Sequence, residues 1–173
     1  MSAVSENGIR RRLRSLALME VANIPLQAWI WFGLIGLPAS APNLVGFTLF
    51  AVLLVQGAGF WAAKLSQVGA PGRRFPPGLR ILSITRVTNP LLLATGVAYT
   101  VVAAAIDPGT ATLPGVVFTV VAVLEHVDYF HVQLMHDTRA DLRRLRAGGL
   151  HRSHLARDLA RYSRLRTARG SVR

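Results

Sequence analysis

The chain has 173 residues, of which 51% are hydrophobic and 16% are charged. It contains no cysteine, which excludes disulfides, thiolate metal sites and cysteine nucleophiles. The formal net charge of +12 is typical of nucleic-acid binding in a soluble protein, but here the apolar residues come in long runs and most basic residues lie outside them. The sequence therefore predicts an all-α, polytopic membrane protein, and nucleic acid is disfavoured as a partner.

Four apolar runs are long enough to cross a bilayer, which takes about 20 helical residues. A basic N-terminal segment (1–15) comes before them, and an Arg-rich tail (138–173) follows the whole helical region (16–137). The predicted crossings are residues 16–37, 43–65, 79–106 and 113–135. The first run competes with a signal peptide, because Ala39-Ser40-Ala41 resembles a cleavage site. It is longer than the usual apolar region of such a peptide and contains polar residues, so we expect a retained helix.

The basic residues mark one side of the predicted bundle. Every Lys and Arg lies in the N-terminal segment, in the 66–78 connector with its flanks, or in the tail. The other two loops contain neither Lys nor Arg. The positive-inside rule therefore predicts a multi-pass protein of a bacterial cell (inner) membrane with both termini in the cytoplasm. The even number of crossings agrees, because it returns the chain to the side on which it began.

Polar residues recur within three of the four runs. In the first run they are spaced i, i+3 and i+7, which places them on one helical stripe that Trp31 continues. The third run has a pair at i, i+3, and the fourth has three polar residues on a shared face. We predict one intramembrane polar cluster open to the cytoplasm, with Arg86 between Glu20 and the acids of the fourth run. The alternative is that these residues hold helices together. The cluster residues are Glu20, Asn23, Gln27, Arg86, Asn89, Glu125, Asp128 and Tyr129.

Three histidines at the end of the fourth run are the only candidates for a metal or haem ligand. His126 and His131 are five residues apart, about 140° around a helix, whereas a zinc-protease pair is four apart. His136 is expected near the inner membrane interface. The first three runs contain no histidine, so only Met19 or a second copy of the chain could supply a second axial haem ligand, and we expect no metal and no cofactor. We expect no catalytic residue either.

The tail predicts a helix from Leu150 to Arg166 after a break at Gly148-Gly149. Leu155, Leu159 and Tyr162 lie on one face of it. Such a basic helix is expected to lie on anionic lipid headgroups at the cytoplasmic face or to dock a partner, and a solvated tail is the alternative. The predicted membrane-surface residues are Arg143, Arg144, Arg146, Arg157, Arg161 and Arg164.

Three functions fit this pattern. The first is a non-enzymatic membrane accessory or interaction protein, with the lipid bilayer, a second copy of itself or another membrane protein as partner. The second is a small oligomeric transporter that uses Glu125 or Glu20 as a proton or cation site. The third is a membrane enzyme or cofactor binder for a lipid-like substrate, with Glu125, Asp128 and His131 as acid–base groups. The sequence favours them in that order.

Overall fold

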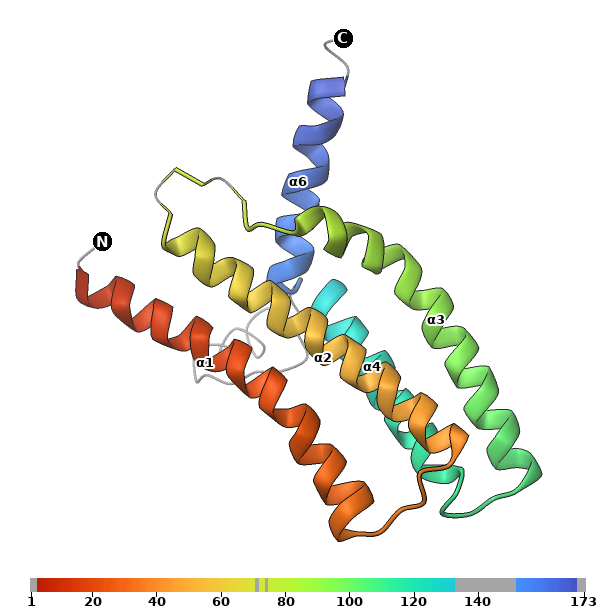
Figure 1. Ribbon diagram of the computed structural model, residues 1–173. Coiled ribbons are helices and arrows are strands. Elements are labelled where there is room, and N and C mark those ends of the chain that lie inside the picture. Colours follow the sequence, from red (N-terminus) through yellow and green to blue (C-terminus); the bar gives the residue numbers. More distant parts are fainter. Residues whose placement is uncertain (1–2, 71, 74, 133–151, 171–173) are drawn as a thin grey trace, which may run out of the picture.

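The computed structural model describes residues 3–70, 72–73, 75–132 and 152–170 (Figure 1). Every named element in this part of the chain is a helix, and one isolated antiparallel bridge joins Val132 to Arg152. The helices are α1 (Ala3–Ala28), the π-helix η1 (Trp29–Leu34), α2 (Ala41–Val68), α3 (Leu79–Ile106), α4 (Leu113–Phe130) and α6 (His154–Gly170). The all-helical fold class is confirmed for the described residues.

Three of these helices are long and apolar enough to cross a membrane: α2, α3 and α4. The predicted third crossing has the bounds of α3, and α2 extends the predicted second crossing at both ends. α4 begins where predicted but ends at Phe130; residues 131–132 of the predicted crossing are not helical, and 133–135 lie outside the described residues. The expected first crossing is not among the three helices. Its apolar run is divided between α1, whose first half carries arginines, and the short η1.

A capping serine and two glycines set helix ends next to the loops. The Ser40 side chain accepts a hydrogen bond from the Asn43 backbone N–H, which caps the start of α2. Gly36 and Gly78 have φ values of +74° and +78°, and glycine adopts this left-handed conformation without the steric cost that other residues bear. These glycines end the η1 region and precede α3, so the chain reverses where the sequence predicts loops.

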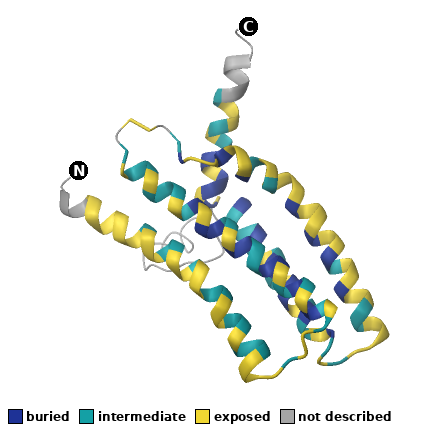
Figure 2. Cartoon of the chain, viewed as in Figure 1, coloured by how far each residue is buried: buried dark blue, intermediate teal, exposed yellow. Residues whose placement is uncertain are grey.

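α2 packs against α1, α3 and α4, and the core lies where these helices meet. Figure 2 shows the buried residues concentrated along α2 and α4, whereas α1 and α3 are largely exposed. Leu53 and Ala122 are fully buried, and Phe118 stacks on the Phe32 ring of η1 and meets the Phe47 ring of α2 edge-on. The exposed faces are apolar: Val87 and Leu91 of α3 are 71% and 73% exposed. A lipid environment suits such a surface, because monomeric soluble proteins rarely expose apolar side chains along whole helix faces.

α2 and α4 approach each other closely through two glycines. A Cβ atom on Gly46 would collide with the carbonyl of Gly115, and one on Gly115 would collide with the carbonyl of Pro42. Small residues allow this kind of close contact between membrane helices. Asn43 lies beside the contact, fully buried, and accepts a hydrogen bond from the Gly115 N–H at 2.8 Å. This contact fixes the α2–α4 crossing.

Candidate functional site

The predicted polar cluster has a core made by α1 and α4. The Tyr129 hydroxyl donates a hydrogen bond to Glu20 Oε1 at 2.7 Å, joining residues 109 positions apart. Glu125 is half-buried and lies close enough to the Glu20 and Asp128 carboxylates and to the Tyr129 phenol to interact with all three. Gly57 of α2 makes room for the Tyr129 ring, since a Cβ there would lie 2.6 Å from the ring. Three carboxylates and one phenol therefore gather near the end of α4 that is closest to α6.

The remaining α1 residues of the predicted cluster form a separate ladder along their own helix. The Gln27 side-chain amide donates to Asn23 Oδ1 at 3.2 Å, and the Trp31 indole N–H donates to Gln27 Oε1 at 2.8 Å. The stripe predicted from the i, i+3, i+7 spacing is present. It runs away from Glu20 toward η1, and so it positions Trp31 instead of completing the acidic group.

The two α3 residues do not join the acidic group. Asn89 is 3% exposed and exchanges two hydrogen bonds with Gln56 of α2, at 2.8 and 3.3 Å. Arg86 is exposed. The ion pairs between described residues are Glu6–Arg10 and Lys64–Asp158. Arg86 therefore does not form the expected ion pairs with Glu20 and the acids of α4. One predicted cluster is thus three sets: an acidic group, an α1 ladder and an α2–α3 amide pair.

His126 is a buried side chain whose ring nitrogens have no hydrogen-bond partner among the described residues. Its ring stacks on the Phe130 ring with centroids 4.8 Å apart and meets the His131 ring with centroids 5.5 Å apart. His131 is exposed, and His136 lies outside the described residues. Within the described ranges, no group of three or more His, Cys, Asp or Glu side chains is arranged to hold a metal ion. His126 therefore packs as an aromatic core residue.

Asn43 and Gln56 carry polar contacts that the predicted cluster omitted. Asn43 Nδ2 donates to the carbonyls of Pro38 and Thr110, both at 2.9 Å, and ties together the two loops at the end of the bundle opposite α6. The signal for Gln56 was its isolation, because a lone polar residue within an apolar helix requires a hydrogen-bond partner.

The tail helix α6 docks on the bundle by its apolar face. Leu155 and Leu159 are each 3% exposed and belong to the core, and Tyr162 contacts Phe75 of the 69–78 connector edge-on at 5.7 Å. The sequence placed these residues on one face, as observed. That face covers the protein's own bundle in this structure, and the expected contact of the basic helix with lipid headgroups or a partner stays a prediction.

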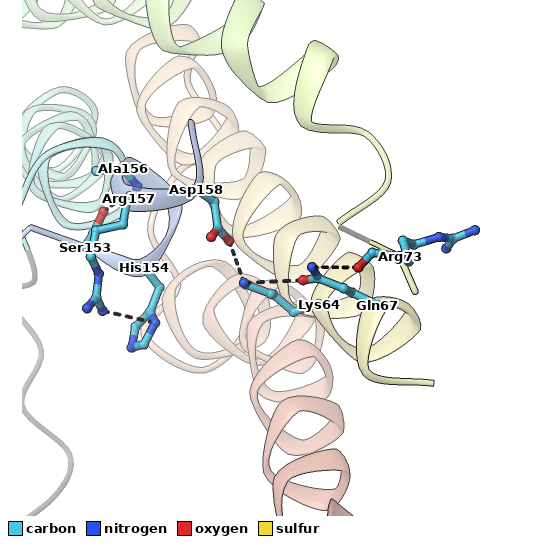
Figure 3. A network of polar contacts seen from close by, with 8 residues as sticks. All are labelled: Lys64, Gln67, Arg73, Ser153, His154, Ala156, Arg157 and Asp158. Atoms are coloured by element: carbon cyan, nitrogen blue, oxygen red, sulfur yellow. Dashed lines mark hydrogen bonds and ion pairs between the residues drawn. The ribbon is translucent and has the colours of Figure 1, made fainter. Parts of the chain in front are cut away.

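Polar contacts reinforce the docking of α6. Lys64 Nζ of α2 lies 2.6 Å from Asp158 Oδ2, and Figure 3 shows Lys64 between Asp158 and Gln67 of its own helix. Ser153 caps α6 by accepting from the Ala156 N–H at 3.1 Å, and its hydroxyl donates to the Tyr129 carbonyl. The residue that begins α6 thus also satisfies an end carbonyl of α4.

The opposite face of α6 carries a basic stripe, defined as Arg157, Arg161 and Arg164. All three are exposed. At about 100° per residue they lie roughly 180–240° around the helix from Leu155. The Arg157 guanidinium also contacts His154 Nδ1 at 3.2 Å. Arg143, Arg144 and Arg146 of the predicted membrane surface lie outside the described residues.

Comparison with known proteins assigns no family: no family description, curated protein or solved structure matches the chain. The geometry of the described residues therefore carries the functional argument. It offers two chemically distinct features, the acidic group around Tyr129 and the docked helix with its basic stripe.

Proposed function

We propose that this is a non-enzymatic membrane interaction protein that presents a basic helix to an acidic partner. The observation that carries this proposal is the docking of α6, whose apolar face is buried on the bundle while the basic stripe faces away from it. A helix held in this way has little conformational freedom left to lose on binding, which favours affinity. Exposed arginines pair well with carboxylates.

In this proposal α1 and η1 together form a fourth crossing, with both termini in the cytoplasm. The apolar part from Leu16 to the end of η1 at Leu34 spans roughly 28 Å, close to the thickness of a bilayer core. The absence of Lys and Arg from the 35–40 and 107–112 loops supports this orientation. α6 then stands at the cytoplasmic face of the cell membrane.

The favoured partner is another membrane protein with an acidic cytoplasmic surface. The bilayer is less suited, because α6 has its apolar face on the bundle and cannot at the same time insert that face among lipids. A second copy of this chain would need an acidic surface facing its stripe. Most of the acids in the described residues lie elsewhere: Glu20, Glu125 and Asp128 are in the bundle, and Asp158 pairs with Lys64.

The test is photo-crosslinking in native membranes from a probe at the exposed Ser163. The Arg157→Gln/Arg161→Gln/Arg164→Gln variant should lose the crosslinked protein, and 1 M salt should weaken crosslinking by shortening the screening length to about 3 Å. The matched control changes three exposed arginines of α1, Arg11, Arg12 and Arg14, to glutamine. Crosslinking to lipid alone, or to a protein that the α6 variant retains, would overturn the proposal.

The acidic group supports a second candidate, a proton- or cation-coupled transporter. The specific observation is the hydrogen bond from Tyr129 to Glu20 beside Glu125, because intramembrane carboxylates often mark ion pathways. In proteoliposomes with an internal pH dye, Glu125→Gln should then abolish proton flux while Glu6→Gln, at an exposed site in α1, retains it. Flux that is zero in the wild type, or equal in both variants, rejects this candidate.

A further inference from the structure

An apolar cavity of about 380 Å³ lies at the end of the bundle opposite α6. It is formed by η1, the residues after it, the 107–112 loop and the first turns of α4. Its volume is within the range typical of small-molecule sites. The lining residues are Trp31, Leu37, Gly109, Thr110, Leu113, Pro114, Val117 and Phe118.

The Asn23–Gln27–Trp31 ladder holds one wall of this cavity. The hydrogen bond of the Trp31 indole to Gln27 leaves the ring fixed, and its edge meets Phe118 with ring centroids 5.7 Å apart. The backbone there is a π-helix, which the Ile35 N–H closes by bonding the Ile30 carbonyl at 2.9 Å, and beyond its end the Leu37 N–H bonds the Trp31 carbonyl at 3.0 Å. π-Helical turns are frequent at functional sites. The ladder thus has a role, which is to position an aromatic wall.

Hydrogen bonds hold the facing loop as firmly. Thr112 Oγ1 donates to the Asp107 carbonyl at 2.6 Å and accepts from the Gly109 N–H at 3.2 Å. The Thr110 carbonyl accepts from the buried Asn43 side chain. These polar groups therefore bond within the loop or to α2, and the loop presents an apolar surface to the cavity.

The mouth of the cavity is continuous with the apolar outer surface of the bundle. The lining residues Leu113 and Val117 are 51% and 55% exposed, so the cavity opens onto the outer surface of α4. Water is a poor occupant, because the almost wholly apolar lining offers it few hydrogen-bond partners. An empty cavity of this size would remove packing contacts that stabilise the bundle. The surrounding lipid is the available source of an apolar occupant.

We propose that this cavity binds one acyl chain of a bilayer phospholipid, in the leaflet on the side opposite α6. The chain lies against Trp31 and Phe118, and its headgroup remains at the interface beside the 107–112 loop. The site is independent of the basic stripe and of the acidic group, and it does not depend on the proposed interaction function.

The experiment uses the purified full chain in micelles with Trp31 as its one tryptophan, after Trp29→Phe and Trp61→Phe. Titration with phosphatidylcholine carrying brominated acyl chains should quench Trp31 in a saturable way, with one lipid bound per protein. Val117→Phe fills the mouth and should weaken binding at least about tenfold, because the chain then loses buried apolar area. The matched control is Val120→Phe, an exposed position one turn further along α4, which should bind within twofold of the parent.

Circular dichroism establishes that each variant is folded. Quenching that rises without saturation in the parent, or that saturates equally in Val117→Phe and Val120→Phe, shows only lipid around the outside of the bundle and overturns the proposal. The stoichiometry of the parent protein is decisive even if Val117→Phe fails to fold.

Discussion

Lys64 and Asp158 form the ion pair that joins α2 to the tail helix, with Nζ and Oδ2 2.6 Å apart. Their side chains are 23% and 13% exposed, so water screens the pair less than it screens the exposed Glu6–Arg10 pair of α1. The contact lies beside Leu155 and Leu159, which are buried. It therefore contributes to holding the basic stripe in one orientation.

Asp158→Asn should loosen the docking of α6. Removing the charge leaves the Lys64 ammonium with Gln67 Oε1 at 3.5 Å but without a carboxylate, a loss of about 1.5–3 kcal/mol, the range for contacts to a charged group. Trypsin cleavage after Arg157, Arg161 and Arg164 should accelerate by about tenfold or more, since cleavage follows the open population. Glu6→Gln, which breaks the exposed pair, is the control and should leave the rate unchanged. Equal cleavage in all three proteins would show that the ion pair does not hold α6.

Gly46→Ala should destabilise the bundle by about 1–3 kcal/mol, because the added methyl group meets the backbone of Gly115 and overpacked cores must shift. Gly59→Ala is the matched control on the same helix, where a Cβ meets open space. It should be neutral or stabilising by up to about 1 kcal/mol through helix propensity. Unfolding by dodecyl sulfate in mixed micelles, followed by circular dichroism, measures both. A Gly46→Ala protein as stable as the parent would refute the close α2–α4 contact.

Asn89→Leu should cost about 1–3 kcal/mol because it leaves the half-buried Gln56 amide unsatisfied. The double variant Gln56→Leu/Asn89→Leu should recover most of this loss. A double-mutant cycle by the same unfolding assay should therefore give a coupling of at least about 1 kcal/mol, within the range for side chains in direct contact. Additive single effects would mean that the two amides do not pair.

Single cysteines test the proposed orientation directly, because the chain has none of its own. Ala39→Cys and Thr110→Cys, both exposed in the two loops opposite α6, should react with an impermeant maleimide applied outside intact cells. Ser66→Cys and Ser163→Cys should react only after the cells are opened. The reverse pattern would invert the topology, and mixed labelling of residues 39 and 110 would remove α1–η1 as a crossing.

Much of the fold follows from sequence pattern, because long apolar runs and their Pro- and Gly-rich boundaries are local signals. α3 has the predicted bounds, and the predicted tail helix corresponds to α6. The division of the first run was not predictable in this way. A π-helical turn has no composition that separates it from the α-helix it continues, and η1 is identified by its backbone hydrogen bond from Ile35 to Ile30.

The site was less predictable, because periodicity places residues on one face of a helix but does not say which neighbour that face meets. The Glu20–Tyr129 contact was within the predicted set, but Asn89 turned to Gln56 instead. The glycine contact between α2 and α4 sets such rotations, and it depends on residues distant in sequence. Likewise, the amphipathic pattern of α6 predicted a buried apolar face, but it cannot distinguish a lipid surface from the protein's own bundle.

The central claim is that α6 is docked on the bundle in one orientation. The most direct test is the distance distribution between spin labels at Ala62→Cys on α2 and Ser163→Cys on α6, both exposed positions, in lipid nanodiscs. The account predicts one narrow distribution in the otherwise unchanged protein, which broadens when Asp158→Asn is added. A broad distribution without Asp158→Asn would mean that α6 is not held on the bundle, and it would contradict the proposal that the protein presents a fixed basic stripe.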